Sequence, residues 1–447
     1  MRNRLPAQGF LSPVRGRSRT ESFSDSVDRV AFLKERRDSP GHHLSDTGMI
    51  PRMQLDIGWR DLARGLSFFF HDCPNDPRVD GFLDEGVIPC LSARSGLDLL
   101  LRTLSLPPGS EVLVSALTIP DMPRILREHG LVPVPVDLDF NSAAIDEASL
   151  SRALGPRTKA ILVANLFGSR PAMDSLFEIS SQNHLFVIED CAQAFVGPGF
   201  RGDSRSDAVL HSFGPIKTAT SLGGGSLRIR DPALRLRAQE LHETWPMQPA
   251  REHFFRILRF GFFKMLLSPA IYPSLVRWIR RTGRDHDQVI TGAARSFRSG
   301  DFFERIRRRP CRPLQRLMHH RIETFPSSLL EARTTQARRI LNGLPAEHVL
   351  GSNAANHTHW VIPLVLPDPE SCRLWLLEEG FDAARAASSL MPVPSPDHLP
   401  DTEPRVTIEA HRGILYLPFG PAMSDADCDK LNSLLRSWFA GMETGDS

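Results

Sequence analysis

Short apolar runs alternate with amphipathic stretches between about residues 80 and 245. The runs lie at residues 111–117, 132–138, 159–167, 185–189, 208–213 and 226–230. Stretches with helical spacing separate them, as at residues 122–129 and 173–183. Strands that alternate with helices in this way are typical of βαβ units around a parallel sheet. We therefore predict an α/β fold whose central sheet is mostly parallel.

The pattern differs on either side of this region, which divides the chain into four parts. Residues 1–52 are rich in Arg, Ser, Asp and Gly, show no sustained period and are predicted to be a disordered tail. Residues 53–244 form the predicted large domain, and residues 245–344, dense in Arg, Phe and Leu, are predicted to be helical. Residues 345–447 mix both patterns and predict a smaller C-terminal α+β domain. Its expected elements are strands at 360–366 and 414–418 and helices at 370–379 and 424–439.

Composition excludes several classes of protein. The 54 basic and 52 acidic residues leave a net charge of +2, and no recognition motif accompanies the Arg-rich patches, so nucleic acid is not an expected partner. No run of about 18 apolar residues predicts a membrane span. The six cysteines form no CxxC pair, so we predict no metal site and expect a reducing cytoplasm.

Candidate chemistry follows two of the predicted strands. Asp190 stands at the end of the run VIED, where a carboxylate can hold a cationic ring nitrogen, although an acidic residue after a strand is also a common turn or cap. The next strand ends in SFGPIK, whose Gly-Pro turn presents Ser212 and Lys217 to the same edge of the sheet. A lysine that loses solvation there becomes nucleophilic, whereas a solvated loop lysine does not.

A third candidate stretch precedes the helical run LDLLLRTL. The small polar residues of LSARSG (91–96) stand at the expected N-terminus of this helix, where a phosphate group fits. The alternative is that Ser92 or Ser95 is only an N-cap, which is the commoner role of such a serine. Along the chain, the phosphate cradle comes first, then the acid and then the lysine. This order is a more specific sign of a cofactor site than any one of the three stretches.

These stretches identify a resemblance. The chain is similar to the DegT/DnrJ/StrS family of sugar aminotransferases, closely over residues 86–243 and more weakly over 310–345 and 357–440. The most specific stretches are EDCAQAF (189–195), SFGPIK (212–217), PPGSEVLVSALTIPD (107–121) and LVPVPVDLD (131–139). The resemblance implies the type I fold of pyridoxal-phosphate enzymes, which is that of aspartate aminotransferase. It also implies a homodimer with the cofactor at the interface.

The resemblance assigns the two catalytic residues. Lys217 would form the Schiff base with pyridoxal phosphate, and Asp190 would pair with the protonated pyridine nitrogen. The ring withdraws electrons only while that nitrogen is cationic. Once an amino donor displaces it, Lys217 would move the proton between the substrate carbon and the cofactor. A relative with histidine in place of this lysine performs dehydration, so Lys217 favours transamination.

Further residues would bind the cofactor by the same resemblance. Gln193 would hydrogen-bond the ring hydroxyl, and Ala192 would lie under one face of the ring. Ser212 and the backbone around Arg94 and Ser95 would bind the phosphate.

The sequence departs from the family at three places. Ile119 stands where the family has an aromatic ring over the cofactor, which forfeits a stacking contribution of about 0.5–1.5 kcal/mol. Pro310 stands near the place of the asparagine that the family's partner subunit sends to the phosphate, and an arginine of the surrounding cluster is a possible replacement. Residues 383–390 (AARAASSL) replace a His/Tyr/Pro-rich substrate loop, so the identity of the sugar does not carry over.

Residues 245–300 are a fourth difference. Phe255, Leu258, Phe262 and Met265 recur at helical spacing among basic residues. Such a helix either packs on the dimer or over the active site with arginines at its rim, which is the commoner case because amphipathic helices usually face a protein core, or lies on an anionic membrane at about residues 250–282.

The predicted function is transfer of an amino group from glutamate to a nucleotide-linked ketosugar, for a polysaccharide or a glycosylated metabolite. One alternative is another reaction of the same cofactor, such as dehydration or transfer to a non-sugar ketone. The other is a membrane-associated, cofactor-binding module with little turnover.

Overall fold

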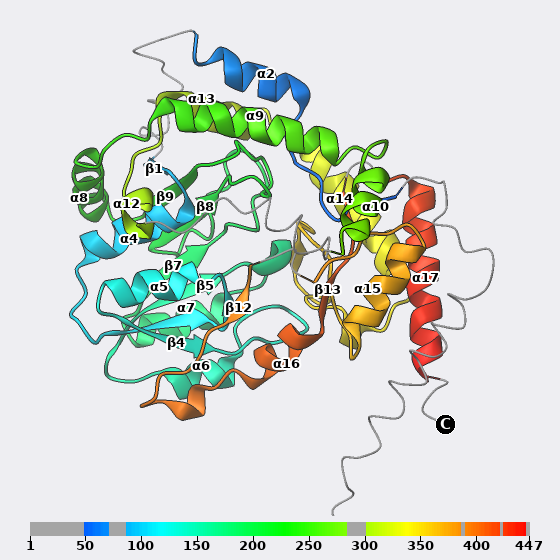
Figure 1. Cartoon of the computed structure of the whole chain (residues 1–447). Helices are drawn as coiled ribbons and strands as arrows, with labels where there is room; N and C mark the ends of the chain where they lie inside the picture. Colours follow the sequence, from blue (N-terminus) through cyan, green and yellow to red (C-terminus); the bar gives the residue numbers. More distant parts are fainter. Residues whose placement is uncertain (1–48, 71–85, 284–300, 386–388, 421–422, 444–447) are drawn as a thin grey trace, which may run out of the picture. The chain divides into compact units, whose positions relative to one another are not determined.

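A seven-stranded sheet forms the centre of the structure (Figure 1). The computed structural model describes residues 49–70, 86–283, 301–385, 389–420 and 423–443. The strands of the sheet, in spatial order, are β1 (Val87–Cys90), β9 (Gly225–Ile229), β8 (Ala208–Ser212), β7 (Phe186–Asp190), β5 (Thr158–Ala164), β2 (Glu111–Ser115) and β4 (Val132–Val136). Each of the six predicted strands is found to within three residues at either end, and β1 was not predicted.

The sheet is mostly parallel, as predicted. Strands β8, β7, β5, β2 and β4 run parallel to one another, whereas β9 and β1 are antiparallel to their neighbours. Helices cover both faces, which explains why the strands read as nearly continuous apolar runs. Because the parallel strands end at one edge, Ala164, Asp190 and Leu210 lie side by side in register there.

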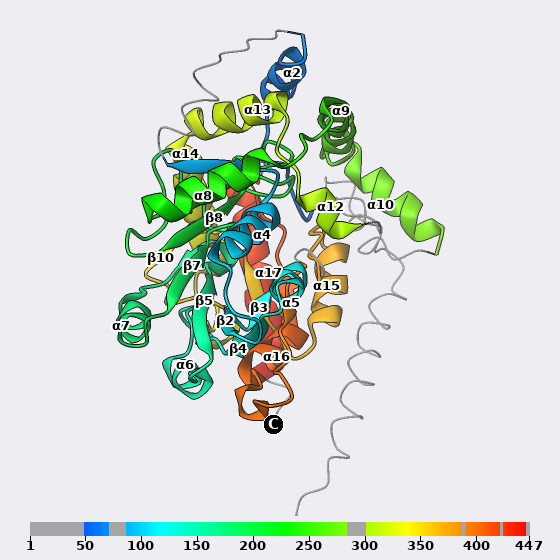
Figure 2. The same cartoon turned by 90° about the vertical axis from the view of Figure 1, so that its left-hand side faces the viewer.

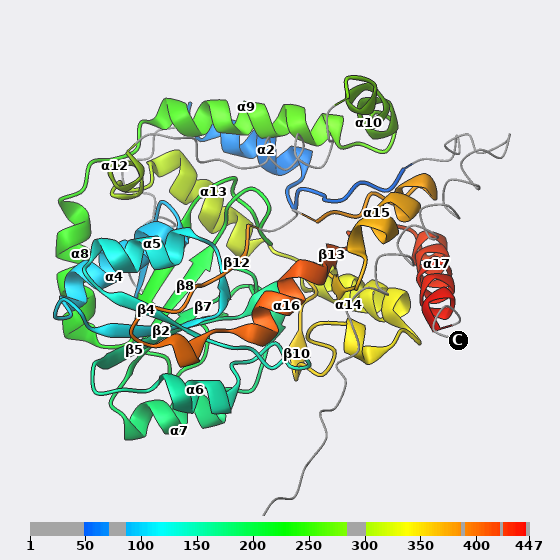
Figure 3. The same cartoon turned by 60° about the horizontal axis from the view of Figure 1, so that its bottom comes forward.

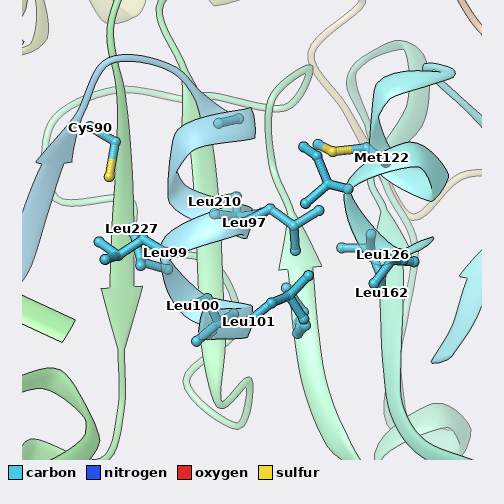
Figure 4. Close-up of a cluster of buried hydrophobic side chains, with 14 of the residues drawn as sticks. Cys90, Leu97, Leu99, Leu100, Leu101, Met122, Leu126, Leu162, Leu210 and Leu227 are labelled. Atoms are coloured by element: carbon cyan, nitrogen blue, oxygen red, sulfur yellow. The ribbon is translucent and has the colours of Figure 1, made fainter. Parts of the chain in front are cut away.

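Helices lie on both faces of the sheet (Figure 2), and two hydrophobic clusters fill the space between them and the strands. One packs α4 (Ala93–Leu104), α5 (Asp121–Glu128) and α8 (Pro232–Glu243) on the sheet. Figure 4 shows Leu97 of α4 among Leu210, Leu162 and Met122 in this cluster. The other lies under α6 (Glu147–Ala153) and α7 (Asp174–Gln182). The sheet is thereby a rigid support for the loops at its edge.

A third cluster is centred on the C-terminal part of the chain. It combines α14 (Ser327–Leu341), β11 (Pro363–Val365), α15 (Pro369–Glu378), β13 (Ile414–Tyr416) and α17 (Asp425–Glu443). Residues Ala337 and Ile340 of α14 are fully buried in it, so this core begins before the boundary predicted at residue 345. The prediction that residues 245–344 are helical includes α14 but does not say which core this helix joins.

Part of the C-terminal region returns to the large sheet. Strand β12 (Met391–Pro392) pairs with β3 (Leu117–Thr118), and α16 (Arg405–Gly413) follows beside it (Figure 3). Asp137 at the end of β4 accepts hydrogen bonds from the backbone N–H groups of Val406 and Thr407 at the start of α16. Short strands β6 (Ser169–Arg170) and β10 (Asn356–His357) pair likewise. Strand pairing and hydrogen bonds therefore connect the C-terminal region to the large sheet at several points.

The predicted tail reached too far along the chain. Residues 1–48 lie outside the described part, but Met49 and Arg52 are buried, and Ile50 forms a bridge with Phe381. Arg52 makes a bidentate ion pair with Asp382, with Nε–Oδ2 and Nη2–Oδ1 distances of 2.8 and 2.7 Å. The pair joins positions 330 residues apart, so no local pattern around residues 49–52 could predict it.

The region predicted to be helical contains α9 (Ala250–Leu266), α10 (Tyr272–Arg281), α12 (Phe302–Ile306) and α13 (Arg312–Glu323). Helix α9 packs on α13 and on α2 (Trp59–Ser67). Among the helices that the structure describes, none is both long and apolar enough to cross a membrane.

Candidate functional site

Lys217 stands in a tight turn after β8. Its backbone N–H donates to the Gly214 carbonyl at 3.0 Å, and the Thr220 hydroxyl closes the turn on the same carbonyl at 2.6 Å. The Lys217 Nζ lies 4.1 Å from the centroid of the Trp360 ring. The indole Nε1–H of Trp360 donates to the Ile216 carbonyl at 2.9 Å, which fixes the ring against the turn.

The environment of Lys217 favours a neutral amine. Burial is the main cause that lowers its pKa to about 8, while Asp190 opposes the lowering and Arg94 adds to it. Within the described residues, no carboxylate or carbonyl hydrogen-bonds its amine. A substantial fraction of Lys217 is therefore nucleophilic near neutral pH.

Asp190 lies at the carboxyl end of β7 and is buried. Its Oδ1 accepts a hydrogen bond from the Ala192 N–H at 2.9 Å. Burial raises its pKa, against the lowering effects of that hydrogen bond and of the charges on Lys217 and Arg94. No donor among the described residues hydrogen-bonds Oδ2, so this oxygen is available to a cationic N–H.

The predicted phosphate cradle is a helix N-terminus beside Ser212. Ser92 is the N-cap of α4, and its Oγ accepts from the Ser95 N–H at 3.2 Å. Ser212 pairs with Gly225 across β8 and β9. A Cβ on Gly225 would stand 2.7 Å from the Ala93 nitrogen, so only glycine lets the strand approach the helix so closely.

Arg94 and Ser95 have defined partners of their own. The Arg94 Nε–H donates to Asp121 Oδ2, which ties the start of α4 to the start of α5. The buried Ser95 hydroxyl lies 3.0 Å from that of Ser92. Ser92 is therefore an N-cap, whereas Ser95 lies within the helix, and the backbone of the first turn is the surface open to an anion.

Gln193 supports the site through the backbone. Its Oε1 accepts from the Phe167 N–H at 2.8 Å, and the Phe167 carbonyl accepts from the Trp360 N–H at 3.1 Å. This chain of hydrogen bonds connects Gln193 to the indole that faces Lys217. Gly168, with φ of +94°, permits the contact, because a Cβ there would lie 2.6 Å from the Trp360 nitrogen.

Of the remaining predicted residues, Ala192 contacts the site through its N–H on Asp190, and Ile119 and Pro310 make no hydrogen bond to Lys217 or Asp190 in the described part of the chain. Ala192 is half-buried in the turn after Asp190. Ile119 is half-buried after β3 and packs against two hydrophobic clusters, and its place over a cofactor ring stays a prediction. Pro310 precedes α13, and its carbonyl accepts from the Gln315 side chain at 2.7 Å.

Of the two arginines in the predicted cluster, Arg309 has a partner within the chain, as do Arg307 and Arg308 before it, and Arg312 is exposed. Arg307 pairs with Asp98 of α4 at 2.9 Å, and Arg308 pairs with Glu252 of α9 at 3.2 Å. The Arg309 Nε–H donates to the Trp245 carbonyl at 2.9 Å. The Arg307–Asp98 pair joins the helical region to α4, and the other two contacts lie within the helical region; a role of an arginine of the cluster in phosphate binding stays a prediction.

A pocket beside Lys217 contains residues that sequence reasoning missed. The Asp56 carboxylate accepts from the Ala219 N–H at 2.7 Å, and Arg333 donates to the Thr218 hydroxyl at 3.1 Å. Trp360 was assigned only to the start of a strand. The pocket is lined by Arg52, Met53, Gln54, Asp56, Ile216, Lys217, Arg333, Trp360, Val361, Leu417, Phe419 and Gly420. Because these residues come from five distant segments, no local motif predicted them.

Comparisons with known proteins agree with this fold and confirm the resemblance. Residues 83–263 match the model of the DegT/DnrJ/EryC1/StrS aminotransferase family. The chain is 33% identical over 187 residues to the GDP-perosamine synthase of Caulobacter vibrioides, covering 41% of this chain and 50% of that protein. It is 33% identical over 177 residues to the dTDP-3-amino-3,4,6-trideoxy-alpha-D-glucose transaminase of Streptomyces venezuelae, covering 37% and 46%.

The fold likeness extends further than the sequence likeness. The crystal structure of the aminotransferase TlmJ from Streptoalloteichus hindustanus superimposes with a TM-score of 0.62 at 19% identity, covering 88% of this chain and all of that one. The prediction of the type I fold is thereby confirmed. In sequence, however, the chain spans about half the length of the curated relatives it matches.

Proposed function

We propose that this chain, whose residues 83–263 match the DegT/DnrJ/EryC1/StrS aminotransferase family, is a pyridoxal-phosphate-dependent aminotransferase with Lys217 as its Schiff-base lysine. One observation carries the proposal. Lys217 and Asp190 lie at neighbouring strand ends, the first with its pKa lowered to about 8 and the second with Oδ2 open to a donor. A lysine that deprotonates readily beside a buried carboxylate is the pair that this cofactor requires.

The residues present fit the cofactor. Asp190 Oδ2 would accept the pyridine N–H, and the first turn of α4 with Ser212 would hold the phosphate, where Gly225 keeps the strand close to the helix. When bound, pyridoxal phosphate supplies an electron sink for the substrate carbon.

The protein's own residues supply the proton transfers. Lys217 would take a proton from the substrate carbon and return it to the cofactor carbon, which needs an amine that is neutral part of the time. Its pKa of about 8 is close to the pH at which such a base works best. Trp360 faces the ammonium form at 4.1 Å and so stabilises the proton that Lys217 carries.

The proposed amino acceptor is a nucleotide-linked ketosugar, with glutamate as the donor. The names of the two curated relatives, a GDP-perosamine synthase and a dTDP-amino-sugar transaminase, support this class. The product would enter a polysaccharide or a glycosylated metabolite. We further propose a homodimer that acts in the cytoplasm, in keeping with the free cysteines at positions 90, 191, 311, 372 and 428.

The first test is covalent. Purified protein is mixed with pyridoxal phosphate, its absorbance spectrum is recorded, and borohydride reduction is followed by peptide mapping. We expect a yellow protein with the reduced cofactor on Lys217. The variant Lys217→Arg should remain colourless, whereas Lys159→Arg, at an exposed lysine of β5, should behave as the wild type. A colourless wild type without adduct contradicts the proposal.

The second test separates transamination from other reactions of the cofactor. Incubation with glutamate should convert bound pyridoxal phosphate to its amine form and release one equivalent of 2-oxoglutarate. A protein that binds the cofactor on Lys217 but leaves glutamate unchanged would instead favour dehydration or another amino donor.

A further inference from the structure

Helix α9 has two apolar faces, and the structure buries only one of them. Its buried residues are His253, Ile257 and Phe260, which face α2 and α13. Phe255 and Phe262 lie roughly half a turn away and are 64% and 59% exposed. The stripe that the sequence marked by its helical spacing is therefore the outer face of the helix.

Further exposed apolar side chains lie on α9, on α2 beside it and on α10, the next helix along the chain. Leu258 and Met265 of α9 are 45% and 42% exposed and complete the spacing of three and four residues. Trp59 of α2 is exposed, and its ring approaches the position that a Cβ on Gly261 would occupy to 3.9 Å. Trp278 of α10 is also 64% exposed. We call these six residues the outer stripe.

Positive charge surrounds the outer stripe. Residues 250–283 contain five exposed arginines against a single acidic residue, Glu252, whereas the whole chain carries only +2; Arg256 and Lys264 of the same segment are half-buried. Arg251 and Arg259 stand one turn before and after Phe255, and both are exposed. Arg277, Arg280 and Arg281 are exposed on α10 around Trp278.

We propose that the outer stripe and its arginines dock on an anionic lipid surface. Exposed aromatic and aliphatic side chains that lie along a helix with arginines at their rim match the composition of helices that lie in a membrane interface. Tryptophan is favoured at that depth because its ring is apolar and its N–H is polar. Acidic headgroups complement the excess of positive charge.

A second copy of the chain fits this surface less well. A two-fold contact would place the same patch on itself and so bring two sets of like charges together in a region from which water is removed. The inner face of α9 already supplies the contacts that hold the helix on the protein. The proposal therefore needs no change in how α9 is packed and is independent of the proposed reaction.

Vesicle sedimentation of the full chain tests the proposal. At physiological ionic strength we expect the protein to sediment with vesicles of phosphatidylcholine and phosphatidylglycerol but not with phosphatidylcholine alone. Higher salt should release it, because the attraction of arginine to headgroups is screened. The absence of sedimentation with the anionic vesicles at both low and physiological salt would overturn the proposal.

Variants at exposed positions separate the two contributions. Phe255→Ser with Phe262→Ser should lower the partition constant by about ten-fold or more, since burial of one such ring in an apolar phase is worth at least that factor. Leu236→Ser with Leu374→Ser, on α8 and α15, removes two exposed apolar side chains elsewhere and should have no effect.

Charge reversal has its own matched control. Arg277→Glu with Arg281→Glu should abolish binding to anionic vesicles, and Arg102→Glu with Arg152→Glu, at exposed positions outside the patch, should not. All variants are compared by light scattering. If the Phe255/Phe262 variant binds vesicles like the wild type, or instead splits a dimer into monomers, the surface belongs to a protein partner and the proposal is wrong.

Discussion

Replacing Arg52 by methionine tests the most unexpected contact of the N-terminal segment. Both side chains of the Arg52–Asp382 pair are 0% exposed, and the Tyr272 hydroxyl also donates to Asp382. Without the Arg52 guanidinium, the buried Asp382 carboxylate keeps the neutral Tyr272 hydroxyl but loses its charged partner. Breaking a buried ion pair on one side costs about 3–5 kcal/mol.

We therefore expect Arg52→Met to lower the free energy of unfolding by about 3–5 kcal/mol. Urea unfolding followed by circular dichroism measures the change. Arg102→Met, at an exposed arginine of α4, is the control and should change the free energy by less than about 0.5 kcal/mol. Both variants remove one positive charge, so the difference between them reports burial.

The double variant Arg52→Met with Asp382→Leu refines the reasoning. It removes both charges and replaces them with apolar groups of similar volume, so it should be more stable than Arg52→Met by about 2 kcal/mol. A loss below about 1 kcal/mol in Arg52→Met would refute the reasoning, because residues 49–58 would then not be docked on the protein as described.

Three further predictions concern the site. The rate at which Lys217 captures pyridoxal phosphate should rise about ten-fold per pH unit below its pKa of about 8 and level off above it. Asp190→Asn should move the midpoint of this pH profile to lower pH, because the carboxylate raises the pKa of Lys217. A rate independent of pH from about 6 to 9 would contradict both statements. Trp360→Leu should lower the Lys217 pKa by roughly half a unit, because a cation–π contact of about 0.5–1 kcal/mol is lost. The same pH profile measures this shift. A higher Lys217 pKa in the variant would mean that water enters the site instead. Gly168→Ala should lower the urea midpoint of unfolding more than Gly109→Ala does. Both glycines have positive φ, but only a Cβ at Gly168 would clash with backbone atoms. Equal shifts would mean that backbone strain alone accounts for the loss of stability.

Local patterns located the parts of the site that one strand and its following turn determine. Asp190 and Lys217 were found because each follows an apolar run, and parallel strands that end at one edge bring such positions together. Ser212 was found in the same way. Trp360 and Arg333 were not found, because each reaches the site from a segment more than 100 residues away, by hydrogen bonds to Ile216 and Thr218.

Helical spacing likewise identified α9 but not its orientation. Phe255 and Phe262 form the more conspicuous apolar stripe in the sequence, yet the structure packs Ile257 and Phe260 against α2 and α13. Periodicity reports that a helix has an apolar face, and it does not report what covers that face.

The sequence by itself determined the alternation of strands and helices, the resemblance to a family and the acid and lysine at two strand ends, because these depend on neighbours along the chain. Only the tertiary structure decided that Arg52 is buried against Asp382, that Trp360 faces Lys217 and that the outer face of α9 is left uncovered. Each of these rests on contacts between residues that are far apart in sequence. Such contacts are selected by the packing of whole elements, and no local pattern of hydrophobic and polar residues encodes them.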